Sequence, residues 1–279
     1  MKKRVGILTS GGDCPGLNAT IRGVAKALYA RMGDNVEIVG IANGYSGLIN
    51  GDYREMTEDD FRGILTLGGT ILGTKRTPFK MMRVVEDDNI DKVAAMKKTY
   101  KAAKLDCLLC LGGNGTHKTA NLLSQEGLNI IGLPKTIDND LCQTDHTPGF
   151  GSAAKYIAST MLEIAHDTFS YPVPSVTVIE IMGRDAGWLT SATALARNEY
   201  NTAPHLIYLP ETPFDLEQFL ADVKSKLETH TAVIVAVSEG IRDKDGNYIS
   251  ATTQAADGFG HSHLSGCLLY TSPSPRDLS

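Results

Sequence analysis

The fold of this chain is decided by two neighbouring stretches, Cys110-Leu-Gly-Gly-Asn-Gly-Thr116 and Pro134-Lys-Thr-Ile-Asp-Asn-Asp140. The first is an apolar run that ends in glycines and a polar residue. This is typical of a strand that stops so that a helix can begin with its backbone amides facing an anion. The second follows the next predicted strand and brings together a lysine and two carboxylates. Together the two stretches predict a site for phosphate chemistry.

The apolar pattern on both sides of these stretches alternates between strands and helices. Strands are expected at residues 5–8, 36–41, 105–111, 129–133, 175–182, 206–209 and 232–237, and helices at about 17–32, 89–103, 116–125, 152–166, 186–196 and 214–229. A turn is expected at 43–47, and Thr57-Glu-Asp-Asp60 is expected to cap a helix. The alternation predicts an α/β fold with mostly parallel sheets flanked by helices. Ligands of such folds bind at the carboxyl ends of the strands.

The polar connection over residues 140–149 is the longest between two apolar strands, which predicts a domain boundary near Phe150. We therefore expect one α/β domain at residues 1–150 and a second at residues 151–266. The alternation stops at residue 267.

Composition and charge exclude two classes of protein. A net charge of -5 without a dense Lys/Arg stripe argues against a nucleic-acid binder. No apolar run reaches the roughly 18 residues of a membrane span, and Met1-Lys-Lys-Arg4 leads into a strand instead of a signal-peptide core. We expect a cytoplasmic protein that contacts neither nucleic acid nor membrane.

Five motifs occur along the chain in a diagnostic order: Ser10-Gly-Gly-Asp-Cys-Pro-Gly-Leu-Asn-Ala19, Gly112-Gly-Asn-Gly-Thr116, Pro134-Lys-Thr-Ile-Asp-Asn-Asp140, Met182-Gly-Arg-Asp-Ala-Gly187 and Ser238-Glu-Gly240. Together they resemble the 6-phosphofructokinases over residues 1–266. The resemblance implies a donor-binding domain at 1–150 and a sugar-phosphate-binding domain at 151–266, with donor and sugar phosphate meeting in the cleft between them. It also implies phosphoryl transfer to the 1-hydroxyl of fructose 6-phosphate, giving fructose 1,6-bisphosphate, with Mg²⁺ as cofactor and a homo-oligomer at full length.

The resemblance assigns roles to individual residues. Phosphoryl transfer to an alcohol needs a base and positive charge around the transferring group, and Asp138 is the implied base. An extended stretch over 136–140 would put Thr136, Asp138 and Asp140 on one face. The further catalytic residues implied are Thr136, Lys135 and Arg184. The implied donor-binding residues are Gly11, Tyr45, Arg76, Asn114, Gly115 and Thr116. The implied substrate-binding residues are Thr136, Asp138, Asp140, Met182, Gly183, Arg184 and Glu239, and Asn114 and Asp140 are the implied metal ligands.

Two positions give opposite indications about the donor. In pyrophosphate-dependent relatives an aspartate commonly replaces the equivalent of Gly115, where it would repel the α-phosphate of ATP. Gly115 leaves that space open. Lys135, however, is typical of the pyrophosphate enzymes, in which its charge stabilises the departing phosphate. An open site admits ATP and a lysine need not exclude it, so we favour ATP and keep pyrophosphate as the alternative.

Other functions remain open alternatives. Asn114 stands where many family members have a metal-binding aspartate, so Mg²⁺ would rest mainly on Asp140 and the phosphates. That loss favours a non-catalytic regulatory subunit that binds sugar phosphate, whereas the presence of Asp138 argues against it. A kinase of the NAD-kinase or lipid-kinase type would explain the motif at 112–116 but not the one at 182–187.

The last residues depart from the family pattern. Cys267-Leu-Leu-Tyr-Thr-Ser-Pro-Ser-Pro-Arg-Asp277 resembles a translated sequencing-library adapter more closely than a disordered Ser/Pro tail. We interpret residues 267–279 as a non-native tail on a fragment truncated near Gly266. The family's later basic residues, which clamp the sugar 6-phosphate, would then be missing. Such a fragment is expected to be inactive, to expose apolar surface and to aggregate.

Overall fold

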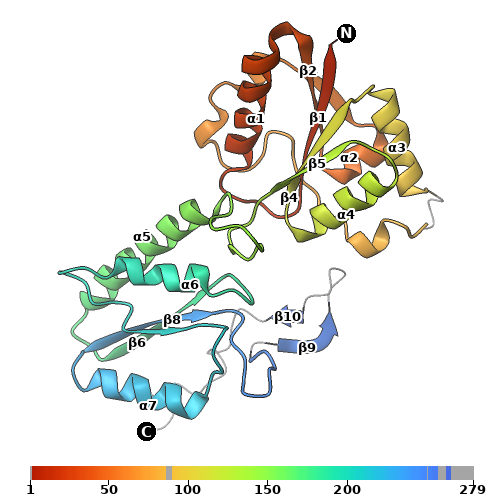
Figure 1. Cartoon of the computed structure of the whole chain (residues 1–279). Helices are drawn as coiled ribbons and strands as arrows, with labels where there is room; N and C mark the ends of the chain where they lie inside the picture. Colours follow the sequence, from red (N-terminus) through yellow and green to blue (C-terminus); the bar gives the residue numbers. More distant parts are fainter. Residues whose placement is uncertain (1, 86–89, 250, 257–261, 265–279) are drawn as a thin grey trace. The chain divides into compact units, whose positions relative to one another are not determined.

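In the computed structural model, which describes residues 2–85, 90–249, 251–256 and 262–264, the first half of the chain forms a five-stranded sheet (Figure 1). Its order is β3-β2-β1-β4-β5, with β1 at Lys3–Ser10, β2 at Val36–Ile41, β3 at Tyr53–Met56, β4 at Cys107–Gly112 and β5 at Ile130–Pro134. All neighbours are parallel except β2 and β3. The chain passes from β1 to β2 on one side and later to β4 on the other. The carboxyl ends of β1 and β4 therefore flank a topological switch point, where such sheets bind ligands.

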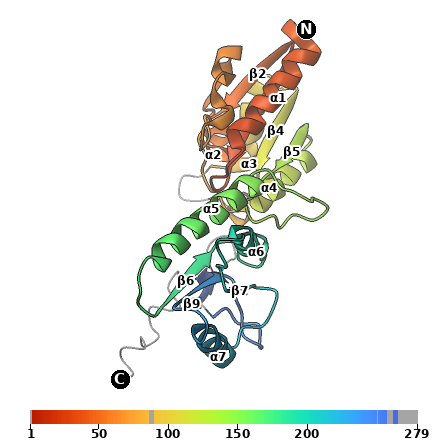
Figure 2. The same cartoon turned by 90° about the vertical axis from the view of Figure 1, so that its left-hand side faces the viewer.

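Helices cover both faces of this sheet (Figures 1 and 2). Helix α1 (Leu17–Met32) lies on one face, and α2 (Tyr45–Asn50), α3 (Lys92–Ala102) and α4 (Asn114–Gln125) lie on the other. Helix α1 buries Leu17, Ile21 and Ala25, which are four residues apart and so share one side of the helix. Four short 3₁₀ helices join these elements, at Gly33–Asn35, Glu58–Phe61, Ile64–Thr66 and Phe79–Met81.

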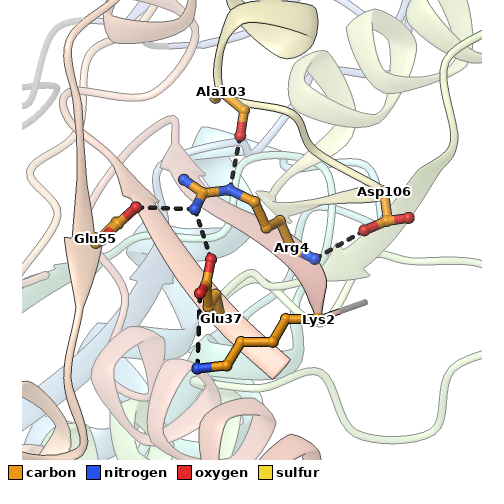
Figure 3. A network of polar contacts seen from close by, with 6 residues as sticks. All are labelled: Lys2, Arg4, Glu37, Glu55, Ala103 and Asp106. Carbon is orange, nitrogen blue, oxygen red and sulfur yellow. Dashed lines mark hydrogen bonds and ion pairs between the residues drawn. The ribbon is translucent and has the colours of Figure 1, made fainter. Parts of the chain in front are cut away.

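A network of ion pairs ties together the amino end of the sheet (Figure 3). The Arg4 guanidinium on β1 donates to Glu37 Oε2 at 2.6 Å and to Glu55 Oε1 at 2.8 Å, so that one side chain joins β1, β2 and β3. Its Nε also donates to the carbonyl of Ala103 at 2.9 Å, and its backbone N–H donates to Asp106 Oδ2 at 2.8 Å. These charges lie at the opposite end of β1 from Ser10, and they hold the sheet without occupying its ligand-binding edge.

The second half of the chain forms a three-stranded parallel sheet in the order β6-β8-β7. Its strands are β6 (Ser175–Ile181), β7 (Leu206–Tyr208) and β8 (Ala232–Ser238). Helices α5 (Phe150–Phe169) and α6 (Trp188–Ala192), with a 3₁₀ turn at Thr193–Ala196, cover one face, and α7 (Leu216–Leu227) covers the other (Figure 1). Met161 packs with Ile234 on the α5 side, and Phe219 packs with Val235 on the α7 side. Strands β9 (Ala251–Ala256) and β10 (Ser262–Leu264) form a separate antiparallel pair.

The chain divides into two compact units. The first contains Met1–Thr136 and Thr147–Gly149, and the second contains Ile137–His146 and Phe150–Ser279. The boundary that we expected at residue 150 thus differs for the segment 137–146. The reason is that Thr147 Oγ1 donates to the Thr136 carbonyl at 2.6 Å, which keeps 147–149 with the first unit, while Asn139 Nδ2 donates to the Asp145 carbonyl at 3.1 Å and closes 137–146 on itself.

The predicted α/β class with mostly parallel sheets is confirmed, and several local features differ from the predictions. The expected turn at 43–47 continues into α2, because Tyr45 and Leu48 are buried in the core. The capping box of Thr57 and Asp60 forms, but it begins a four-residue 3₁₀ helix because Gly63 then takes a φ of 72°. Strand β3 was not expected from the sequence.

Two further expectations concern the ends of the chain and membranes. The predicted non-native tail at 267–279 lies outside the described residues. Among the helices that the structure describes, none is long and apolar enough to cross a membrane.

Candidate functional site

Three predicted residues meet at the carboxyl edge of the first sheet. Gly11 follows β1 with a φ of 102°, which side-chain-bearing residues rarely adopt. A Cβ built on Gly11 would lie 3.8 Å from Lys135 Nζ and 3.9 Å from Thr116 Oγ1. Thr116 Oγ1 in turn donates to the Ser10 carbonyl at 3.2 Å. The loops that follow β1, β4 and β5 therefore converge on Gly11.

The amino end of α4 opens beside this point. Gly113 is the N-cap residue, and Asn114 and Gly115 in the first turn are exposed. A Cβ built on Gly115 would have no heavy atom within 4 Å. The first amides of a helix carry partial positive charge and attract anions. The end of α4 thus offers an open surface to a phosphate group.

Lys135 brings a positive charge to the same edge. It follows β5 directly, is only 7% exposed, and its Nζ donates to the backbone carbonyl of Gly12. A buried ammonium group must be satisfied by hydrogen bonds or by an opposite charge. Its position next to Gly11 lets an anion supply part of that compensation.

Arg76 lies over the β1–α1 loop. A Cβ built on Gly12 would lie 2.7 Å from Arg76 Nη2, so the guanidinium occupies the space that a side chain would fill. Arg76 itself is exposed. Its planar fork of donors suits the oxygens of a phosphate.

Hydrogen bonds fix the loop that carries Arg76. Thr74 Oγ1 donates to the Gly11 carbonyl at 2.7 Å, and Thr9 Oγ1 donates to the Gly73 carbonyl at 2.8 Å. At the start of the loop, the buried Asn18 donates from Nδ2 to the Leu67 carbonyl at 3.0 Å, and Ile71 N donates to its Oδ1 at 2.8 Å. The sequence analysis did not find these supports, because nothing in the sequence links Asn18 to a loop about 50 residues later.

Tyr45 supports the site through a buried contact with the first turn of α4. It is 1% exposed, and its hydroxyl donates to the Thr116 carbonyl at 2.7 Å. Burial raises the pKa of Tyr45 well above its ordinary value, so the hydroxyl stays protonated. We expected Tyr45 beside the donor, and the structure places it under the first turn of α4.

A hollow of about 370 Å³ adjoins Arg76 in the first unit. It lies between the end of α2 and the residues that follow Arg76. Its lining residues are Ser46, Ile49, Asn50, Lys75, Arg76, Thr77, Pro78, Met81, Ile90 and Lys92.

The segment 136–140 is not extended, so the predicted alternation of its side chains is wrong. Thr136 bridges to Gly149, the backbone bends at Ile137 and Asp138, and Asn139 takes a left-handed φ of 56°. Asparagine tolerates this conformation better than most residues. Lys135 and Thr136 belong to the first unit, whereas Asp138 (half-buried) and Asp140 (exposed) belong to the second.

The described residues offer no complete metal site of their own. No group of three His, Cys, Asp or Glu side chains among them is arranged to hold a metal ion. Asp140 is exposed and lines a hollow of about 730 Å³, together with Asn139, Leu141, Cys142, Thr144, Asp145, His146, Phe150 and Trp188. Mg²⁺ commonly takes one or two protein oxygens and completes its shell with water and substrate phosphates. An exposed carboxylate such as Asp140 fits Mg²⁺ only in that mode.

The loop Met182–Gly187 follows β6 at the carboxyl edge of the second sheet. Glu239, just after β8, accepts hydrogen bonds at Oε1 from Gly183 N and Arg184 N, both at 3.1 Å. A Cβ built on Gly240 would lie 1.6 Å from the Arg184 carbonyl oxygen, so only glycine fits there. Met182 is 60% exposed and is not a core residue.

The predicted site residues thus gather in two sets, one in each unit. The first unit brings together Gly11, Arg76, Asn114, Gly115, Thr116 and Lys135, with Tyr45 beneath them. The second unit brings together Gly183, Arg184 and Glu239, while Met182 precedes this group and Asp138 and Asp140 lie on their own loop.

In a comparison with known proteins, residues 4–266 match the phosphofructokinase family. The chain belongs to this family. It is 48% identical over 249 residues to an ATP-dependent 6-phosphofructokinase of Spirochaeta thermophila, covering 88% of this chain and 66% of that protein. It is 39% identical over 264 residues to a pyrophosphate–fructose 6-phosphate 1-phosphotransferase of Amycolatopsis methanolica, covering 94% of this chain and 72% of that protein.

Solved phosphofructokinase structures share the fold. A pyrophosphate-dependent phosphofructokinase from Nitrosospira multiformis superposes with a TM-score of 0.76 at 31% identity, over 88% of this chain and 62% of that chain. The chain spans about two thirds of the length of these relatives: 66% of the Spirochaeta protein and 62% of the Nitrosospira chain.

Proposed function

We propose that this chain carries the donor-binding and acceptor-binding residues of a 6-phosphofructokinase, an enzyme that transfers a phosphoryl group from ATP to the 1-hydroxyl of fructose 6-phosphate. The observation that carries the proposal is the convergence of Lys135 and Arg76 on the Gly11–Gly12 loop, beside the open amino end of α4. Two cations and a helix terminus in one place suit the phosphates of a donor.

In the donor half, the chain's own groups would stabilise charge. Arg76 would offer two parallel donors to the transferring phosphoryl group, and Lys135 would neutralise charge on the leaving phosphate. Gly11 lets the β1–α1 loop approach the phosphates closely because it has no side chain, and its φ of 102° also favours glycine at this position.

In the acceptor half, Asp138 would take the proton of the sugar 1-hydroxyl as the oxygen attacks phosphorus. Arg184 would hold the sugar phosphate, with Met182 and Gly183 beside it. Glu239 already accepts hydrogen bonds from Gly183 N and Arg184 N. It would therefore orient the Met182–Gly187 loop and also accept hydrogen bonds from the sugar hydroxyls. Thr136 would position the acceptor next to Asp138.

Asp140 and Asn114 are the proposed protein ligands of Mg²⁺. When bound, the ion would neutralise charge on the donor phosphates. Because the described protein ligands do not form a complete site, metal affinity should depend on the phosphate donor being present.

ATP is the preferred donor in this proposal. The space around Gly115 is open, and the hollow beside Arg76, about 370 Å³, falls in the roughly 300–1,000 Å³ range of small-molecule sites. The ATP-dependent relative from Spirochaeta is 48% identical, and the pyrophosphate-dependent relative from Amycolatopsis is 39% identical. Pyrophosphate remains the second candidate because Lys135 Nζ lies beside Gly11.

The deciding experiment assays the full-length gene product with fructose 6-phosphate and either ATP or pyrophosphate, and identifies the product by ³¹P NMR. We expect fructose 1,6-bisphosphate with ATP. Absence of transfer from both donors would refute the proposal, and phosphorylation of NAD or diacylglycerol instead would favour the related kinases. A cytoplasmic location and a homo-oligomeric state are part of the same proposal.

A further inference from the structure

Three side chains outside the predicted site form a cluster against the Met182–Gly187 loop. Arg242 Nη2 donates to Asp185 Oδ1 and, at 2.6 Å, to the hydroxyl of Tyr248, and that hydroxyl donates to Asp185 Oδ1. The Arg242 guanidinium carbon also lies 4.3 Å from the centroid of the Tyr248 ring. Asp185 immediately follows Arg184. The cluster therefore grips the loop one residue away from the proposed sugar-phosphate ligand.

A tight turn after β8 presents the two partners of Asp185. Arg242 and Tyr248 bridge each other across the turn, and Asp243 Oδ1 closes it by accepting from Asp245 N at 2.9 Å and from Asn247 N at 2.8 Å. Burial and the Asp185 carboxylate raise the pKa of Tyr248, so its hydroxyl stays protonated and available as a donor. The turn is thus preformed and needs no ligand to hold Arg242 in place.

The backbone of the loop needs such support. Arg184 has a φ of 45°, in the left-handed region that disfavours a residue with a long side chain. Glu239 holds its N–H, and Ser238 Oγ donates to its carbonyl at 3.4 Å. These bonds restrain Arg184 from the β8 side, and the Asp185 contacts restrain the following residue.

We propose that Asp185, Arg242 and Tyr248 are positioning residues for the sugar-phosphate loop, which hold the Arg184 backbone in its left-handed conformation and so aim its guanidinium. The inference rests on the proposed function of Arg184. None of the three has to touch substrate. Their exposure makes a stabilising role secondary, because the Asp185 side chain is 64% exposed and exposed ion pairs add little to folding stability.

The first test compares steady-state kinetics of Arg242→Met, Arg242→Lys and Tyr248→Phe in the full-length gene product. Arg242→Met should raise KM for fructose 6-phosphate about tenfold, with KM for ATP unchanged and kcat within about threefold of the parent. Arg242→Lys should restore part of the affinity for fructose 6-phosphate, because lysine keeps the positive charge but lacks the planar, forked donors of the guanidinium. Tyr248→Phe should have a smaller effect, since the ion pair remains.

Tyr208→Phe is a matched control in the same unit. It removes the hydroxyl of another tyrosine that donates to a carboxylate, Asp222 Oδ2 at 2.8 Å, but on β7 and α7. It should leave KM for fructose 6-phosphate unchanged. A KM for ATP that rises together with KM for fructose 6-phosphate in Arg242→Met would mean a general loss of structure and would overturn the inference.

A second readout separates this inference from the proposed function. Hydrogen exchange of the Gly183 and Arg184 amides should be faster in Arg242→Met than in Tyr208→Phe, whatever reaction the protein catalyses. Faster exchange in a protein that does not phosphorylate fructose 6-phosphate would refute the proposed function and leave the loop restraint standing. Unchanged exchange and unchanged KM in both Arg242→Met and Tyr248→Phe would refute the positioning role.

Discussion

The hydroxyl of Tyr45 donates a hydrogen bond to the backbone carbonyl of Thr116 across a distance of 2.7 Å. The bond ties α2 to the first turn of α4, and Thr116 in turn reaches the end of β1 through the Ser10 carbonyl. Both partners are buried. The open surface at Gly115 therefore rests on a fixed support, and the first turn of α4 can bind a ligand without first being ordered.

Replacing this support should weaken both folding and donor binding. Tyr45→Phe keeps the ring in the core but removes the donor to Thr116, so we expect the free energy of unfolding to fall by about 1–3 kcal/mol. KM for the phosphoryl donor should rise, with KM for fructose 6-phosphate nearly unchanged. Urea unfolding and steady-state kinetics measure the two effects. Tyr171→Phe, at a tyrosine that is 61% exposed, is the control and should change neither.

The choice of donor should depend on charge at position 115. A Cβ there meets no heavy atom within 4 Å, so an aspartate fits without a clash next to the proposed donor site. Gly115→Asp should lower kcat/KM for ATP by about 100-fold or more, while pyrophosphate is tolerated. Gly115→Asn adds similar bulk without the charge and should cost much less. Unchanged ATP kinetics in Gly115→Asp would contradict the argument.

The general base is testable in the same assay. Asp138→Asn should lower kcat by about 10²–10⁴-fold with little change in KM for fructose 6-phosphate, because the amide keeps the shape but cannot take the proton. The exposed Asp145 on the same loop is a control, and Asp145→Asn should leave kcat unchanged. Full activity of Asp138→Asn would remove Asp138 from its proposed role. A parent that binds the sugar phosphate without turnover would favour a regulatory subunit.

Much of the fold and of the first half-site was predictable from short-range pattern. Helix α1 and strand β2 have the predicted limits, Leu17–Met32 and Val36–Ile41, because apolar period and turn residues fix them locally. The convergence of Gly11 and Thr116 follows from parallel strands, whose carboxyl ends share one edge. Strand β3 was not predicted because its middle residues, Arg54 and Glu55, are exposed and charged, and because it forms the edge of the sheet.

Contacts between distant residues were not predictable. Arg242 and Asp185 are 57 residues apart, and neither belongs to a pattern that points to the other. The prediction of an extended segment at residues 136–140 was wrong for a different reason. Alternation assumes an extended chain, and a single left-handed Asn139 is enough to break it.

The change in the free energy of unfolding below neutral pH should depend on His117 in α4. Its ring packs against Gly132 of β5, where an added Cβ would lie 2.5 Å from Nδ1, and among the described residues its buried Nε2 has no hydrogen-bond partner. Burial lowers the pKa of His117 below its ordinary value of 6.5, although a hydrogen bond with the Gly112 backbone opposes the shift.

The direction of this pH dependence follows from the pH at which the folded and the unfolded chain each bind a proton at His117. The unfolded chain protonates His117 near pH 6.5, but the folded chain does so only at lower pH, so the free energy of unfolding should fall as the pH drops from about 6.5 toward the folded pKa. His117→Leu should flatten this slope in urea unfolding between pH 8 and pH 5. A second change, His205→Gln, should flatten it further, because burial and the charge of His230 also lower the pKa of His205. A slope identical to that of the parent in His117→Leu would show that His117 is protonated equally well in both states.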